Sequence, residues 1–195
     1  MTNLTHSYYC GESSSQIIYE TIGNYFDYIS ERFPDEEALV VRHQDVRWSY
    51  SQFRDKVDEL ATGLLALGIG PGDRVGIWGP NSYEWIMVQY ATAKIGAIMV
   101  CVNPAYRLHE LEYALNKVEC KAIVSAESFK TSMYLEMLAT LAPELGECEP
   151  GALKSTKEAT DEVAVMIDTR RSPCSQEIRC PSASKASPLE PGSLP

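Results

Sequence analysis

The chain has 195 residues, with 27 acidic against 17 basic side chains and a formal net charge of −10 at pH 7. This acidic balance argues against a nucleic-acid-binding protein or one that binds an anionic membrane surface, because phosphate contacts need clustered Lys and Arg. Apolar residues make up 45% and charged residues 23% of the chain, which is typical of a globular fold and excludes disorder throughout.

The start of the chain shows no targeting segment. Its first 20 residues contain neither Lys nor Arg and no apolar core run, so neither a secretory signal nor an Arg-rich mitochondrial presequence is predicted. The longest apolar run, from Ile95 to Val102, is far shorter than the roughly 20 residues that a membrane-spanning helix needs. We expect no membrane span, and we expect residues 1–16 to be a flexible leader.

Three elements are predicted in the first third of the chain. Thr21–Arg32 is predicted to be a helix, and the segments Ala38–Arg42 and Val46–Tyr50 are predicted to form a hairpin around His43-Gln44-Asp45. In Ser51–Leu67 the apolar residues recur at intervals of three and four, which is typical of one wide helical face. Ser51 is expected to cap the start of this helix and Gly68 to end it.

Glycines 68, 70 and 72 suggest a nucleotide-binding loop, but their position argues against it. A phosphate-binding glycine loop follows a strand and opens a helix, so that the helix N-terminus faces the phosphate. Here the segment Gly68–Asp73 follows a helix and precedes the strand Arg74–Trp78. The sequence therefore predicts a helix C-cap followed by a tight turn.

The next elements are a strand, a turn and a buried helix. Val75–Trp78 is a continuous apolar run, and Tyr83–Ile95 is apolar almost all round, with Ser82 placed to cap it. The turn Gly79–Trp85 between them has two interpretations. It is either an anion-binding strand-to-helix turn or, as we favour, a capped turn that only positions the helix.

Two further strand–helix pairs are predicted. The strand Ala97–Val102 is followed by a loop at Asn103–Tyr106, which either is a surface loop or lies where α/β folds place ligands. An amphipathic helix follows over residues 108–118, then the strand Ala122–Val124 and a helix at Ser128–Leu141. This alternation predicts an α/β fold, a mostly parallel sheet flanked by helices.

The composition changes near residue 155. All 18 aromatic residues lie between Tyr8 and Tyr134, while residues 156–195 hold five Pro, six Ser and one Gly. Such a segment buries too little apolar surface to offset its ordering entropy, so we expect a disordered C-terminal tail. Glu162–Ile167 is predicted to form at most one turn or a short strand, with no evident partner.

No catalytic, cofactor-binding or metal-binding residue is predicted from the motifs. No Cys-x-x-Cys pair is present, and no second His follows His109-Glu110 at the spacing of a zinc protease. The Gly-x-Ser-x-Gly pattern of a serine nucleophile is missing from the sequence. The six cysteines are spread along the chain: Cys10, Cys101, Cys120, Cys148, Cys174 and Cys180.

The segments GDRVGIWGPNSYEW and VNPAYRLHELEYAL, in this order and register, resemble the N-terminal part of the adenylate-forming (AMP-binding) superfamily. The likeness is strongest to its mitochondrial medium-chain fatty acyl-CoA synthetases, and it runs from about Ser7 to Ser155. It implies that residues 17–155 are the N-terminal part of an AMP-binding domain. The fold expected for the chain is thus a partial N-terminal subdomain of such an enzyme.

The resemblance implies a reaction in two steps. A fatty carboxylate attacks the α-phosphorus of ATP and releases pyrophosphate, and the thiol of coenzyme A then displaces AMP from the acyl-adenylate. In the family the ATP, Mg²⁺ and coenzyme A are handled by a Ser/Thr/Gly-rich phosphate loop ending in Pro-Lys-Gly and by later motifs. None of these has a matching position in this sequence, so no site residue is carried over.

The resemblance leads to two hypotheses. The chain is a truncated acyl-CoA synthetase without activity of its own, or it is a non-catalytic interaction module that pairs with the full-length enzyme. Self-association is expected if the piece exposes surface that a longer chain would cover. The resemblance implies a mitochondrial location, with a cytoplasmic form as the alternative because no presequence is visible.

Overall fold

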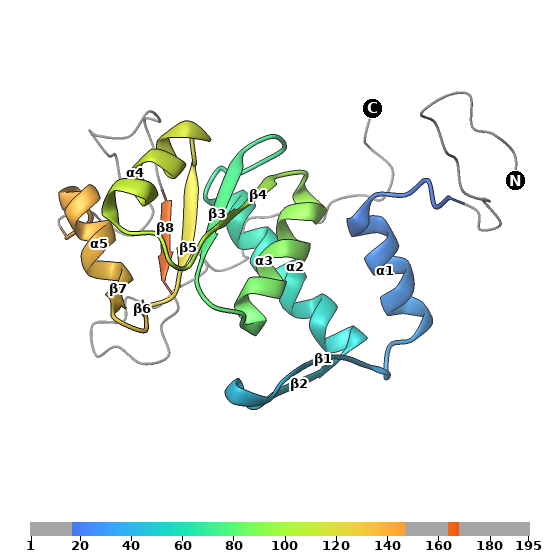
Figure 1. The fold of residues 1–195 in the computed structure, drawn as a ribbon. Helices are drawn as coiled ribbons and strands as arrows, with labels where there is room; N and C mark the ends of the chain where they lie inside the picture. Colours follow the sequence, from blue (N-terminus) through green and yellow to red (C-terminus); the bar gives the residue numbers. More distant parts are fainter. Residues whose placement is uncertain (1–16, 147–163, 168–195) are drawn as a thin grey trace, which may run out of the picture.

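The computed structural model describes residues 17–146 and 164–167. Its centre is a four-stranded sheet of β3 (Arg74–Trp78), β4 (Ile98–Val102), β5 (Ala122–Ser125) and β8 (Ala164–Ile167). The strand order is β4-β3-β5-β8, and every neighbouring pair is parallel (Figure 1). The predicted α/β fold with a mostly parallel sheet is therefore confirmed.

The strand β8 corrects one expectation. The segment Glu162–Ile167 was expected to lack a partner, yet Ala164–Ile167 pairs with β5 over its whole length. The pairing joins segments about 40 residues apart in sequence, so no local pattern could have indicated it. The predicted leader at 1–16 and most of the predicted tail at 156–195 lie outside the described residues.

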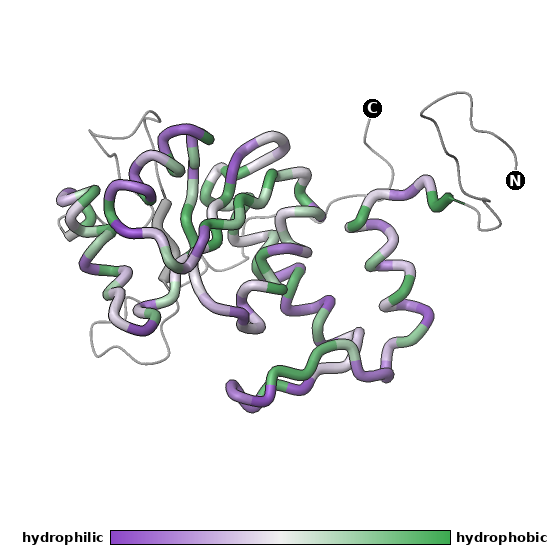
Figure 2. The backbone as a smooth tube through the Cα atoms, in the orientation of Figure 1, coloured by the Kyte–Doolittle hydropathy of each residue, from purple (hydrophilic) through white to green (hydrophobic). Residues whose placement is uncertain are grey.

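Helices cover both faces of the sheet. On one face α1 (Ile22–Arg32), α2 (Tyr50–Ala66) and α3 (Tyr83–Ile95) pack over Val75 and Ile77 of β3. On the other face α4 (Leu108–Lys117) and α5 (Tyr134–Leu141) pack over Trp78 and Ile123. Successive residues of a strand point to opposite faces, so an apolar run such as β3 fills both cores at once. Figure 2 shows the strands as largely hydrophobic between these layers.

The boundaries of α3 agree with those predicted from the sequence. The hydroxyl of Ser82 accepts a hydrogen bond from the Trp85 backbone N–H, and Gly96 ends the helix at a φ of 72°. A left-handed residue at this position is the usual helix terminator, and glycine adopts it without steric cost.

A separate antiparallel hairpin consists of β1 (Glu37–Val41), the short helix η1 (Arg42–Gln44) and β2 (Val46–Ser49). It extends from the helical layer, as Figure 1 shows. The predicted hairpin is confirmed. The prediction of Ser51 as the cap of α2 is wrong, because Ser49 accepts the hydrogen bond from the Gln52 backbone N–H. Gln52 returns a bond to the Ser49 backbone N–H, and this reciprocal capping box starts the helix two residues earlier.

The predicted helix Ser128–Leu141 was too long. Residues 128–133 form a small hairpin of β6 (Ser128–Phe129) and β7 (Ser132–Met133), with Lys130 in the turn at a φ of 54°. A residue in the left-handed region cannot continue a right-handed helix, so α5 begins only at Tyr134. After α5 the first described segment, residues 17–146, ends in the short helix η2 (Pro143–Gly146).

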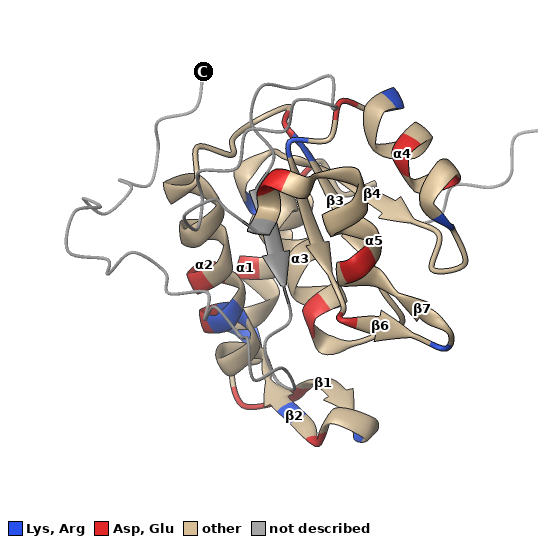
Figure 3. Cartoon of the chain, turned by 90° about the vertical axis from the view of Figure 1, so that its left-hand side faces the viewer, with Lys and Arg blue, Asp and Glu red and all other residues tan. Residues whose placement is uncertain are grey.

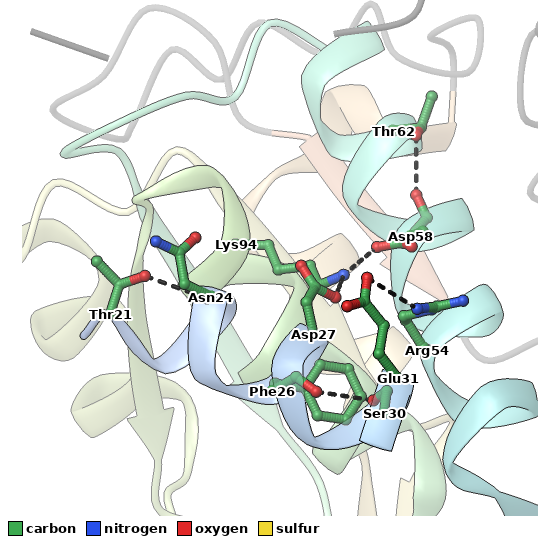
Figure 4. A network of polar contacts seen from close by, with 10 residues as sticks. All are labelled: Thr21, Asn24, Phe26, Asp27, Ser30, Glu31, Arg54, Asp58, Thr62 and Lys94. Carbon is green, nitrogen blue, oxygen red and sulfur yellow. Dashed lines mark hydrogen bonds and ion pairs between the residues drawn. The ribbon is translucent and has the colours of Figure 1, made fainter. Parts of the chain in front are cut away.

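A network of charged side chains ties α1 to its neighbours (Figure 4). The ammonium of Lys94, whose side chain is only 12% exposed, lies 2.5 Å from a carboxylate oxygen of Asp27 on α1 and also pairs with Asp58 on α2. A second pair, Arg54 with Glu31, joins α2 to α1 at 3.8 Å. One partly buried cation thereby links three helices, which fixes α1 against the layer.

No helix within the described part of the chain is long and apolar enough to cross a membrane. The same residues contain no group of three or more His, Cys, Asp or Glu side chains that could hold a metal ion.

Candidate functional site

The best-placed cavity lies beyond the carboxyl ends of β3 and β5. The connection that leaves β3 leads to α3 on one face of the sheet, whereas the connection that leaves β5 leads to α5 on the other face. Open α/β sheets bind ligands in the crevice where neighbouring strands diverge in this way. A cavity of about 630 Å³ occupies this crevice.

The charged groups around this cavity are mostly acidic. Its lining includes the carboxylates of Asp45, Glu84 and Glu127, together with His43, and it contains neither Lys nor Arg. A triphosphate carries several negative charges, so carboxylates facing it would repel it. The cavity lies where the fold places ligands, but its charge does not suit ATP or another phosphate ester.

The turn before α3 is engaged by side chains of the chain itself. The Ser82 hydroxyl accepts from the Trp85 N–H at 3.3 Å, and the side-chain oxygen of Gln44 accepts from the Tyr83 N–H at 2.9 Å. The amide nitrogen of Gln44 donates to Glu84 at 2.8 Å. Because donors of this helix end are satisfied internally and a carboxylate lies beside them, the capped-turn interpretation fits better than an anion site.

The loop after β4 is held by two stacked aromatic rings. The indole of Trp78 and the ring of Tyr134 lie 3.7 Å apart between centroids, and both side chains are fully buried. The Trp78 Nε1 donates to the Asn103 carbonyl at 3.1 Å, and the Tyr134 Oη donates to the Pro104 carbonyl at 2.6 Å. We call the rings of Trp78 and Tyr134, together with the loop Asn103–Arg107, the aromatic clamp.

Three further hydrogen bonds stabilise the loop of the aromatic clamp. The Asn103 side chain accepts from the Ala105 N–H at 2.9 Å, and its carbonyl also accepts from the Tyr106 N–H. Arg107 donates to the buried Ser132 at 2.6 Å. Burial raises the pKa of the Tyr134 phenol, which keeps it protonated as a donor. These hydrogen bonds hold the loop in place at the carboxyl edge of the sheet. Their partners could not be predicted from the sequence of the loop.

The glycine-rich segment lies at the opposite edge of the sheet, before β3. Gly68 and Gly72 have φ values of 77° and 82°, and the Ile69 N–H bonds back to the Leu64 carbonyl. This is the predicted helix C-cap and turn, so the interpretation as a nucleotide loop is excluded. Asp73 closes the turn by accepting from the Gly70 N–H at 2.8 Å.

Asp73 is also paired with a lysine. The Lys121 ammonium lies 2.9 Å from its carboxylate and donates to the Gly68 carbonyl at 2.7 Å. Partial burial acts to raise the pKa of Asp73, but the Gly70 hydrogen bond and Lys121 outweigh it, so the pKa lies below its ordinary value.

We expect Asp73→Asn to destabilise the fold in a pH-dependent way. A lowered folded-state pKa stabilises the protein above the pKa of the unfolded chain, and this contribution is lost as the pH falls through the folded-state value. At pH 7 the loss should be about 1–2 kcal/mol in urea unfolding, and it should shrink towards pH 3. The exposed Asp35, changed to Asn, serves as the control with little effect at either pH. If Asp73→Asn lowers the free energy of unfolding by the same amount at pH 7 and at pH 3, the stabilisation by Asp73 does not come from its ionised carboxylate.

The sequence matches a known enzyme family over most of its length. A family model described as AMP-binding enzyme matches residues 26–191. The mouse protein "Medium-chain acyl-CoA ligase ACSF2, mitochondrial" is 46% identical over 162 residues, which cover 83% of this chain and 26% of the mouse protein. The chain thus spans about a quarter of the length of the curated relatives it matches.

Solved structures show the same fold. A fatty acyl CoA synthetase of Mycobacterium tuberculosis superposes with a TM-score of 0.62 at 23% identity, over 76% of this chain and 26% of that protein. The N-terminal domain of FACL13 from the same organism gives a TM-score of 0.60 at 24% identity, over 75% of this chain and 34% of that domain. At these identities the likeness establishes the architecture alone.

Proposed function

The chain belongs to the AMP-binding enzyme family, and from this membership we propose that it forms part of a ligase that activates medium-chain fatty acids with ATP. The observation that carries the proposal is the 46% identity to the mouse medium-chain acyl-CoA ligase. The proposed reaction joins a fatty carboxylate to the α-phosphorus of ATP with loss of pyrophosphate. The thiol sulfur of coenzyme A then attacks the acyl carbon, and AMP leaves.

In this proposed reaction the described residues support the fold of the enzyme and take no part in the chemical steps. Adenylate formation needs donors and a metal ion converging on the triphosphate. The charged side chains around the cavity beyond β3 and β5 are mostly acidic, and the glycine turn lies at the far edge of the sheet. We therefore propose that no catalytic, metal or cofactor-binding residue lies in the described part of the chain, and that ATP, Mg²⁺ and coenzyme A are not bound there.

The purified chain should accordingly not exchange pyrophosphate into ATP when octanoate is supplied. The expected rate is that of a reaction without enzyme, and ATP at millimolar concentration should not raise the thermal midpoint, since a ligand stabilises only the state that binds it. A preparation of the longer mouse relative, assayed in parallel, is the positive control. Octanoate-dependent exchange by a homogeneous preparation of this chain would overturn the proposal of an inactive scaffold.

The second candidate is a non-catalytic module that pairs with a full-length enzyme of the family. It is favoured by the exposed edge strand β4, where Ile98 is 51% exposed. Mixing the two proteins distinguishes the candidates, because a pairing module would change the exchange rate of the full-length enzyme and an inert scaffold would not.

We also propose a mitochondrial location, supported by the names of the mouse and human relatives, which describe them as mitochondrial. A cytoplasmic form is the alternative. Fractionation of cells that express the chain with a C-terminal tag distinguishes the two.

A further inference from the structure

Within the part of the chain that the structure describes, the edge strand β4 has no neighbour along one side. Among residues 17–146 and 164–167 it pairs with β3 alone, at the end of the strand order β4-β3-β5-β8. In a parallel strand the N–H and C=O of one residue point to the same side. The Ile98 N–H donates to the Asp73 carbonyl, so residues 98, 100 and 102 bond to β3. The backbone groups of Met99 and Cys101 therefore point outward from the sheet.

This edge lacks the features that usually protect an edge strand. Natural sheets block such strands with Lys, Pro, a bulge or an inward-pointing charge. The sequence of β4 is IMVCV, without charge or proline, and its register with β3 runs without a bulge. Ile98 is 51% exposed and the Cys101 thiol is exposed. Figure 3 shows β4 beside β3 with no charged residue along it and with α4 next to it.

A groove of about 380 Å³ runs between β4 and α4. Its β4 side is apolar, and its α4 side is a stripe of His109, Glu110, Tyr113 and Lys117, one helical face. Tyr113 lies at the middle of α4 and is 64% exposed. Glu110 and Lys117, near the two ends of this stripe, carry opposite charges. The surface is therefore close to neutral, in a chain whose net charge is −10.

We propose that β4 and the α4 stripe form the interface of a two-fold homodimer. A two-fold axis perpendicular to the sheet at Val100 would bring two β4 strands together antiparallel, with Met99 opposite Cys101 of the second copy. Both residues present their N–H and C=O groups outward, so each pair forms two ladder hydrogen bonds. The result is one continuous sheet of eight described strands without the open β4 edges.

The same axis makes the α4 stripe self-complementary. The two α4 helices lie on the same face of the joined sheet and run antiparallel. Tyr113 then faces its own copy, while Glu110 faces Lys117 of the second copy and Lys117 faces Glu110. This reciprocal match of charge is the reason for proposing a second copy of this chain as the occupant of the groove.

Sedimentation equilibrium of the full chain tests the proposal. From about 1 to about 100 µM the apparent mass should rise from 21.7 kDa towards twice that value. Cys101→Lys places a charge on the edge at an already exposed position, and it should weaken the dimer at least tenfold without changing the circular dichroism of the monomer. Thr140→Lys, exposed on α5 away from the groove, is the matched control and should leave the mass unchanged.

A cross-link tests the register. In the proposed dimer Val100 faces its own copy as a non-hydrogen-bonded pair with Cα atoms about 4.5 Å apart, which suits a disulfide. Val100→Cys should give a disulfide dimer after mild oxidation, with the cross-link at residue 100 identified by mass spectrometry, whereas Thr140→Cys should not. A monomer at every concentration overturns the proposal. So does a dimer that Cys101→Lys does not weaken and Val100→Cys does not cross-link.

Discussion

Substitution of Ala91 by Asp should destabilise the fold by about 3–5 kcal/mol, the range for a buried charge without a partner. Ala91 lies in the middle of α3 with no exposed surface, inside the core cluster that α1, α2 and α3 form over the sheet. The side chain of an aspartate there would meet Val88 and the apolar strand residues. Neither would solvate a carboxylate, so the charge must be neutralised or the helix must move.

Chemical unfolding at pH 7 measures this effect, with Gln89→Asp as the control on the same helix. Gln89 is exposed, so its substitution adds the same charge to α3 without burying it and should cost below about 1 kcal/mol. Equal effects of the two substitutions would show that α3 is not the buried helix of the fold.

Removal of the Trp78 side chain should be almost as damaging. Trp78 is fully buried, stacks on Tyr134 and donates to the Asn103 carbonyl. Truncation of a buried tryptophan to alanine costs about 3–5 kcal/mol through lost contacts and the remaining cavity. Trp78→Ala should therefore destabilise the chain by that amount and release the loop of the aromatic clamp.

Two milder substitutions separate packing from hydrogen bonding. Trp78→Phe keeps an aromatic ring against Tyr134 but leaves the Asn103 carbonyl without its indole donor, and Tyr134→Phe removes only the donor to Pro104. Each should cost about 1–3 kcal/mol. If Trp78→Phe proves as harmful as Trp78→Ala, the hydrogen bond and not the stacked ring dominates the clamp.

Elements with strong local signals were predictable from the sequence. Ser82 and Gly96 bracket an apolar segment, and α3 begins and ends between them as predicted. The glycines at 68 and 72 follow a helix and precede a strand, and this position predicts their roles as the helix terminator and part of the following turn. In these cases the physical cause lies within a few residues of the feature, so a pattern in the sequence is enough.

Features that depend on distant residues were missed. The partner of β8 lies about 40 residues before it, and the Gln44 side chain reaches α3 across 39 residues of chain. The aromatic clamp likewise joins Trp78, Asn103 and Tyr134 from three separate elements. Local competition explains the other errors, since Ser49 outcompeted Ser51 as a cap and the turn at Lys130 shortened α5.

The division of the helices between the two faces of the sheet has a consequence for synthesis. The helices of one face, α1 to α3, all precede β4, whereas those of the other face, α4 and α5, follow it. A chain leaving the ribosome can therefore complete one layer once Val102 has emerged, while Trp78 and Val100 wait uncovered until Leu141 follows. At about 5–20 residues per second, the 39 residues between these points take about 2–8 s. During that interval one face of the nascent sheet is covered by helices, while the other exposes apolar side chains and is prone to aggregation. This is the stage of synthesis at which a chaperone would matter most.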